Sequence, residues 1–266
     1  DGVKLICEAA QEYIPAYDFL KQLLKKEKEA VIEYIRKYYN NDNILNFLSG
    51  LKKNMYLFST GRDALFSVYK KLSGKRIWIP DFLCEAIFQP LRGIDSEICF
   101  YHIGIDLKSE LNFQPKTDDF VLIINYFGFF DDKLYSFCKV KGCGVISDVT
   151  HIIFDKDKMS EISHLSHFVI GSIRKFFSLP DGAFLLSESE AEIKNEYRYE
   201  FLKMRTYGFF SRYYSFINGF NNDENLLFLK GAEKLLDESY DYGFSIGYLS
   251  ENILKSLLFK SLFSLI

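Results

Sequence analysis

The stretch GSIRKFFSLPDGAFLL, residues Gly171 to Leu186, is the part of the chain that decides the fold. The residues that lead into it, Phe168 to Ile173, are mostly apolar and partly β-branched, which is typical of a buried strand. The turn residues Pro180-Asp181-Gly182 and the apolar run Ala183 to Leu186 then predict a strand that returns beside the first. Lys175 therefore lies just past a strand end, where a lysine more often simply reaches into solvent than performs chemistry.

The composition favours one sizeable folded core and gives no sign of a nucleic-acid partner. Hydrophobic residues make up 48% of the 266 positions, and the net charge of −3 leaves no basic footprint. The sequence holds no apolar run long enough to span a bilayer, and its first ten residues lack the pattern of a secretory signal. The five cysteines are scattered, without the spacing of a zinc site. We therefore expect a reduced, cytoplasmic, enzyme-like chain without a metal.

A second segment, Met55 to Leu72, combines a short strand, a turn of small residues and an amphipathic helix. The turn is Ser59-Thr60-Gly61, and the helix is expected to begin near Arg62. The first backbone N–H groups of a helix have no intrahelical partner and can bind an anion. The alternative is an ordinary helix start that Ser59 or Thr60 caps.

Further apolar runs predict a mostly parallel sheet. The expected strands are Arg76 to Ile79, Glu97 to Ile103, the run that begins at Asp119, and the run that begins at Cys143. Their spacing, with helical stretches between them, favours parallel βαβ units and an α/β fold. Ligands bind at the carboxyl ends of the strands in such sheets. Asn125, Asp148 and the turn at Gly61 should all lie at that edge.

Helical segments flank this region on both sides. The apolar residues of Tyr17 to Tyr39 recur at helical spacing, and the chain after Ser187 reads as further helices. We therefore divide the sequence into an N-terminal helical segment, 1–54, an α/β domain, 55–190, and a helical extension, 191–266.

In their order, these segments resemble the DegT/StrS family of pyridoxal-phosphate-dependent sugar aminotransferases, which have fold type I. The similarity covers roughly half of the chain and rests on three motifs. They are Ser59-Thr60-Gly61-Arg62-Asp63-Ala64-Leu65, Asp148-Val149-Thr150-His151, and Lys175 followed by Asp181-Gly182. The resemblance implies a pyridoxal 5'-phosphate cofactor and transfer of an amino group from glutamate to a keto sugar, possibly linked to a nucleotide.

The resemblance also implies roles for three catalytic-site residues. Lys175 would hold the cofactor as a Schiff base and later move a proton. Asp148 would pair with the pyridine nitrogen, although an aspartate after a strand is otherwise read as a helix cap. His151 would hydrogen-bond the phenolic oxygen, and a buried core histidine is the competing interpretation.

Other positions are assigned by the same resemblance. Gly61 and Arg62 would bind the cofactor phosphate, and Ser172 would donate its hydroxyl to it. Family members often stack an aromatic ring on the cofactor, but counting from the nearest strand end places Cys84 there, with Phe82 nearby.

The C-terminal part departs further from the family. The Asn-x-Arg motif that reaches into the neighbouring subunit would fall near Ser245 and Gly247, and its arginine is missing. A small domain that the resemblance implies would follow Ile266. We expect a homodimer with a shared site, with Ser245 near the partner's phosphate. The alternatives are a degenerate member with a binding or scaffold role, and a pyridoxal-phosphate enzyme of other chemistry.

Overall fold

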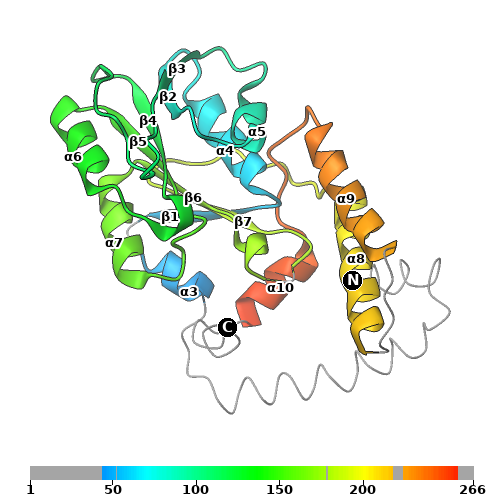
Figure 1. Cartoon of the computed structure of the whole chain (residues 1–266). Helices are drawn as coiled ribbons and strands as arrows, with labels where there is room; N and C mark the ends of the chain where they lie inside the picture. Colours follow the sequence, from blue (N-terminus) through cyan, green and yellow to red (C-terminus); the bar gives the residue numbers. More distant parts are fainter. Residues whose placement is uncertain (1–43, 52, 178, 218–223, 257–266) are drawn as a thin grey trace.

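A computed structural model of the chain describes residues 44–51, 53–177, 179–217 and 224–256, so the helix expected at residues 17–39 lies outside the described part. Its centre is a seven-stranded sheet in the order β1-β7-β6-β5-β4-β2-β3 (Figure 1). The strands are β1 (Asn54–Phe58), β2 (Arg76–Pro80), β3 (Glu97–Tyr101), β4 (Phe120–Ile124), β5 (Gly144–Asp148), β6 (Phe168–Gly171) and β7 (Ala183–Ser187).

The sheet is mostly parallel, which confirms the predicted α/β class. Strands β2 to β6 pair in parallel, whereas β7 runs antiparallel to both β6 and β1. The link from β6 to β7 is too short for a crossover helix, so β7 returns beside β6. Gly171 permits this pairing at close range, because a Cβ there would lie 2.4 Å from the ring of Phe184. The insertion of β7 between β6 and β1 was not predicted from the sequence.

Helices cover both faces of the sheet. They are α3 (Ile44–Ser49), α4 (Gly61–Lys71), α5 (Glu85–Phe88), α6 (Asp132–Lys141), α7 (Lys156–Leu165), α8 (Tyr199–Ile217), α9 (Glu224–Asp237) and α10 (Tyr248–Ser256). Short 3₁₀ turns lie at η1 (Gln89–Leu91), η2 (Tyr126–Gly128) and η3 (Ile173–Lys175). The described helices cannot cross a bilayer, since none of them is both long and apolar enough.

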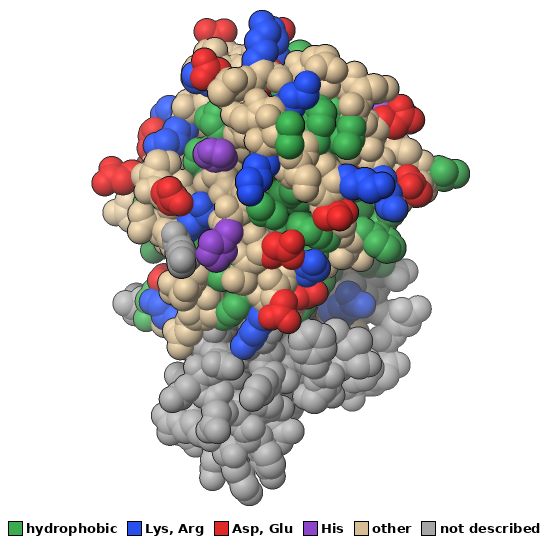
Figure 2. All heavy atoms as spheres, turned by 90° about the vertical axis from the view of Figure 1, so that its left-hand side faces the viewer, with side chains coloured by type: hydrophobic (Ala, Val, Ile, Leu, Met, Phe, Trp, Pro, Cys, Tyr) green, Lys and Arg blue, Asp and Glu red, His purple; other side chains and the backbone are tan. Residues whose placement is uncertain are grey.

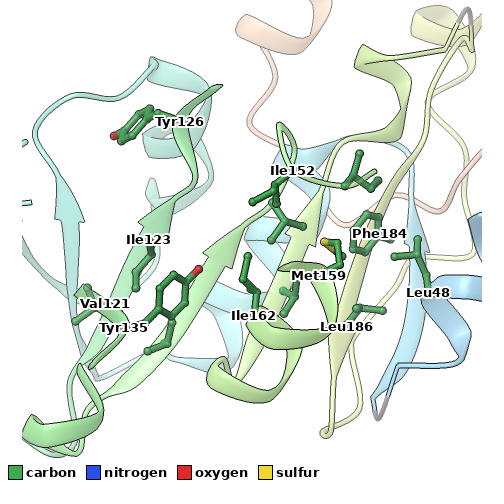
Figure 3. Packing of buried hydrophobic residues seen from close by; sticks show 14 of the residues in the cluster. Leu48, Val121, Ile123, Tyr126, Tyr135, Ile152, Met159, Ile162, Phe184 and Leu186 are labelled. Atoms are coloured by element: carbon green, nitrogen blue, oxygen red, sulfur yellow. The ribbon is translucent and has the colours of Figure 1, made fainter. Parts of the chain in front are cut away.

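The core has two layers, one on each face of the sheet. Figure 3 shows Val121 and Ile123 of β4 directed into the layer that also holds Met159 and Ile162 of α7. Leu122, between the two β4 residues, belongs to the opposite layer with α4 and α5. A strand with both faces buried is what an uninterrupted apolar run predicts.

Helices α8 and α9 lie side by side at one end of the sheet (Figure 1). Part of the aromatic-rich stretch packs within the chain itself, since the ring of Tyr207 lies 5.5 Å from that of Phe228, and Phe66 lies 5.6 Å from Tyr242. On the face that carries α6 and α7, acidic and basic side chains are interspersed (Figure 2). That face therefore offers no extended basic surface.

Candidate active site

A cavity of about 390 Å³ lies at the carboxyl ends of β4 and β5. This volume is in the range of sites that bind small molecules. Its polar wall is formed by Asn125, Asp148, Thr150, His151 and Lys175, and its other wall by Phe82, Leu83, Cys84, Ile87, Ile124 and Tyr126. The structure thus brings together residues singled out in the sequence, namely Phe82, Cys84, Asn125, Asp148, His151 and Lys175.

Asp148 is the last residue of β5 and is half-buried. Its Oδ1 accepts a hydrogen bond from the backbone N–H of Thr150 at 2.9 Å. The interpretation of Asp148 as a helix cap is wrong, because α7 begins at Lys156 and Asp155 caps it. The Asp148 carboxylate is therefore available to a ligand bound in the cavity that it lines.

His151 is exposed and forms part of the cavity wall, so the competing interpretation as a buried core histidine is wrong. Its Nδ1 accepts a hydrogen bond from the backbone N–H of Phe127 at 3.1 Å. The two rings also stack, with centroids 5.7 Å apart and planes inclined by 12°.

Lys175 ends the η3 turn that follows β6, and its side chain is exposed in the cavity. Its side-chain amine has no ion pair or hydrogen bond with the residues that the structure describes, whereas its backbone N–H donates to the Ser172 carbonyl. The guanidinium of the preceding residue, Arg174, pairs instead with Glu233 on α9, with N–O distances of 2.8 and 3.3 Å. The Lys175 amine is therefore available to a ligand.

The start of α4 shows the capped helix start that was the alternative interpretation. Thr60 is the helix cap and forms a capping box with Asp63. The backbone N–H groups of Gly61 and Arg62 remain at the first turn, where an anion could bind. The Arg62 guanidinium is engaged elsewhere, with Gln89 at 2.8 Å and Asp237 at 2.5 Å.

Ser172 connects the start of α4 to the cavity. A Cβ on Gly61 would lie 3.8 Å from the Cβ of Ser172, so the two residues are neighbours. The backbone N–H of Ser172 donates to Thr150 Oγ1 at 3.1 Å, and Thr150 lines the cavity. The expected anion site of Gly61, Arg62 and Ser172 thus lies beside the cavity.

Cys84 and Ser245, two of the predicted positions, differ in their relation to the cavity. Cys84 lines the cavity next to Phe82, whose ring packs on Tyr126 with centroids 5.5 Å apart. Ser245 lies outside the cavity lining, and both its N–H and its hydroxyl donate to the Glu196 carbonyl, at 3.1 and 3.0 Å. Its hydroxyl is thus engaged within its own chain.

Sequence reasoning missed Tyr126 and Phe127, which follow β4. Burial raises the pKa of the Tyr126 hydroxyl, and the nearby carboxylates of Asp81 and Asp148 raise it further. Tyr126 therefore keeps its proton, which it donates to the Phe82 carbonyl. An apolar run followed by aromatic residues carries no signal for these contacts.

The sequence matches no family model and none of the curated proteins. Several solved structures share part of its shape. Serine palmitoyltransferase from Sphingomonas wittichii is 17% identical, with a TM-score of 0.42 over 55% of this chain and 40% of that one. A structure of SPT with PLP is 15% identical, with a TM-score of 0.42 over 60% and 48%. Sphingosine-1-phosphate lyase from Burkholderia pseudomallei is 12% identical, with a TM-score of 0.45 over 70% and 51%. The chain spans about half the length of these proteins or less.

Proposed function

We propose that the chain binds pyridoxal 5'-phosphate in this cavity and is an aminotransferase that uses Lys175 to hold the cofactor. One observation carries the proposal. Lys175, Asp148 and His151 come from the ends of two neighbouring parallel strands and line one cavity of suitable size. An amine, a carboxylate and an imidazole in one place are the groups that this cofactor requires.

The residues present fit the cofactor. Asn125 lines the cavity and is 2% exposed, and its buried Oδ1 has no hydrogen-bond partner within the described part of the chain. The rest of the lining is largely apolar, which suits an aromatic ring. The first turn of α4, with Ser172 beside it, offers N–H and hydroxyl donors for a phosphate.

When bound, pyridoxal phosphate supplies an electron sink for negative charge that develops on a substrate carbon. Asp148 would hold a proton on the pyridine nitrogen and so keep the cofactor ring able to accept this negative charge. Lys175 Nζ would attach the cofactor and move a proton between substrate and cofactor carbons. The apolar wall, with Ile87 and Ile124, would exclude water from the reacting atoms.

Glutamate as amino donor and a keto sugar, possibly linked to a nucleotide, as acceptor are supported by the resemblance of the three motifs. A scaffold protein without activity, or a pyridoxal-phosphate enzyme of other chemistry, are the alternatives. The retained amine of Lys175 and its open access favour an enzyme.

Changing Lys175 to alanine should abolish covalent attachment of the cofactor. Borohydride treatment of the parent protein with pyridoxal phosphate should fix the label on Lys175, as peptide mass spectrometry would show. Lys139→Ala, which removes an exposed lysine of α6, should label like the parent. Label on a different lysine in the parent would refute the assignment.

Changing Asp148 to asparagine should leave the cofactor bound and reduce amino transfer by at least about 100-fold, because an amide cannot keep the pyridine nitrogen protonated. The measurement is the rate at which glutamate bleaches the visible absorbance of the bound cofactor. Near-parental rates in this variant would remove Asp148 from its proposed role.

We also propose a homodimer that shares the site. Phe82, in the segment after β2, and Phe127 and Phe129, in the turn after β4, are 54%, 70% and 65% exposed, and Phe82 lines the cavity, so exposed aromatic rings lie on the two segments that follow these strands. Sedimentation at micromolar concentration should give twice the chain mass of 31.1 kDa. Phe129→Ser should weaken the dimer, whereas Val140→Ser, at the opposite edge of the sheet, should not. A monomeric parent protein that transfers amino groups would contradict the shared site.

A further inference from the structure

The turn that follows β4 is braced against the turn that follows β5. The backbone N–H and the side-chain Nδ2 of Asn125 both donate to the Asp148 carbonyl, at 3.1 and 3.0 Å. Two residues on, the backbone N–H of Phe127 donates to His151 Nδ1 at 3.1 Å. The turn that follows β4 therefore hydrogen-bonds both to the backbone of Asp148 and to the imidazole of His151.

The backbone of the turn that makes these contacts has an unusual conformation. Phe127 has φ 52° and ψ 21°, in the left-handed region that a bulky residue rarely occupies. Gly128 has φ 90°, and a Cβ there would lie 3.4 Å from the His151 carbonyl. Strained backbone of this kind persists where the surroundings require it and is concentrated at functional sites.

A backbone amide can only donate, so the nitrogen that it meets must offer a lone pair. His151 Nδ1 is therefore unprotonated, and the proton of the neutral ring is on Nε2. We propose that the turn of residues 125–128 fixes His151 in the Nε2–H form and orientation, with Phe127 as the positioning residue. The imidazole then acts in the cavity as a hydrogen-bond donor.

This assignment selects the ligand atom that can face His151. An acceptor oxygen is favoured there, whereas a hydroxyl or amine donor would oppose the Nε2–H and leave a polar group unpaired. The ligand part of the inference rests on the proposed function, because the phenolic oxygen of pyridoxal phosphate is the acceptor that we assign. The tautomer itself depends only on the protein.

The tautomer can be measured without a cofactor. Long-range ¹H–¹⁵N correlation spectra of the neutral ring distinguish the two nitrogens, and the signals of His151 are assigned from their loss in His151→Asn. We expect a single Nε2–H form in the parent protein and in Phe127→Gly, which keeps the N–H and suits a positive φ. Replacing Phe127 by phenyllactate turns the N–H into an ester oxygen and should release a mixture of tautomers. A protonated Nδ1 in the parent, or an unchanged spectrum in the ester, would overturn the inference.

A second measurement tests what the donor does for a ligand. His151→Gln keeps an N–H near the position of Nε2, whereas His151→Asn keeps an acceptor near Nδ1 and places no N–H at the position of Nε2. In titrations with pyridoxal phosphate, the glutamine variant should bind within a few-fold of the parent, and the asparagine variant on the order of 10- to 100-fold more weakly. The reverse order would contradict a donor role. If the parent protein failed to bind the cofactor, the proposed function would be refuted. The spectra would still show which nitrogen of His151 carries the proton.

Discussion

Replacing Asp63 by alanine is expected to lower the free energy of unfolding by about 3–5 kcal/mol. The Asp63 side chain is fully buried and meets Arg198, which is 8% exposed, in a two-pronged ion pair with N–O distances of 2.8 and 3.1 Å. The same carboxylate accepts the backbone N–H groups of Thr60, Gly243 and Phe244. Its loss would leave a buried guanidinium and several backbone donors with weaker or no partners.

Denaturant unfolding of the parent and the variant measures this effect. The matched control is Glu192→Ala, which breaks the exposed ion pair with Lys70 and should cost less than about 1 kcal/mol. Asp63→Asn, which keeps an acceptor of the same shape, should fall between the two. A loss no larger in Asp63→Ala than in the Glu192 control would show that the buried contacts do not stabilise the fold.

Replacing Asp181 by asparagine is expected to stabilise the protein at neutral pH. Burial raises the pKa of this carboxyl to about 6, against the opposing effect of the hydroxyls of Ser250 and Ser59 and the N–H of Gly247. Asp181 Oδ1 and Ser59 Oγ are both buried without a hydrogen bond of normal geometry. An asparagine would still accept from Gly247, and its NH₂ group could donate to Ser59.

The sign of the pH dependence follows from the raised pKa. The folded protein holds this proton up to about pH 6, whereas the unfolded chain releases it near the ordinary value of 3.8. Stability contributed by Asp181 is therefore complete at low pH and is lost as the pH rises through this window, by about 3 kcal/mol in total.

The comparison is best made by unfolding the parent and Asp181→Asn in denaturant at pH 5 and pH 7.5. The variant should gain up to about 3 kcal/mol over the parent at pH 7.5 and roughly half of that at pH 5. Asp95→Asn, which changes an exposed aspartate, should leave stability unaltered at both values. Equal effects of Asp181→Asn at the two pH values would exclude a protonation at this site.

The sheet and its polar edge could be predicted because they depend on local patterns. Apolar, β-branched runs that end in turn residues indicate buried strands. Parallel strands share a carboxyl edge, so Asp148 and Lys175, at the ends of β5 and β6, had to lie close together. Strand direction thus predicted the shared edge, and the resemblance of the three motifs added Lys175 to it.

Other features depend on contacts between distant segments, for which the sequence has no signal. The pairing of the Arg62 guanidinium with Asp237 on α9 depends on where α9 packs. The Ser245 hydroxyl is bonded to its own chain for the same reason. A left-handed Phe127 could not be anticipated either, since phenylalanine has no preference for that conformation.

The position of β7 between β6 and β1 has a consequence for the order of events during synthesis. β1 is the first strand of the sheet to leave the ribosome, yet its partner β7 is the last. β1 cannot form its backbone hydrogen bonds with β7 until Ser187 has left the ribosome. Such a long-range pairing is entropically costly and slow to form. The block from β2 to β6, which carries Asp148 and His151, can assemble earlier. The turn before β7 also holds the start of α4, because the N–H of Gly182 donates to the Ser59 carbonyl at 2.7 Å, so the candidate phosphate site gains this contact only when β7 is in place.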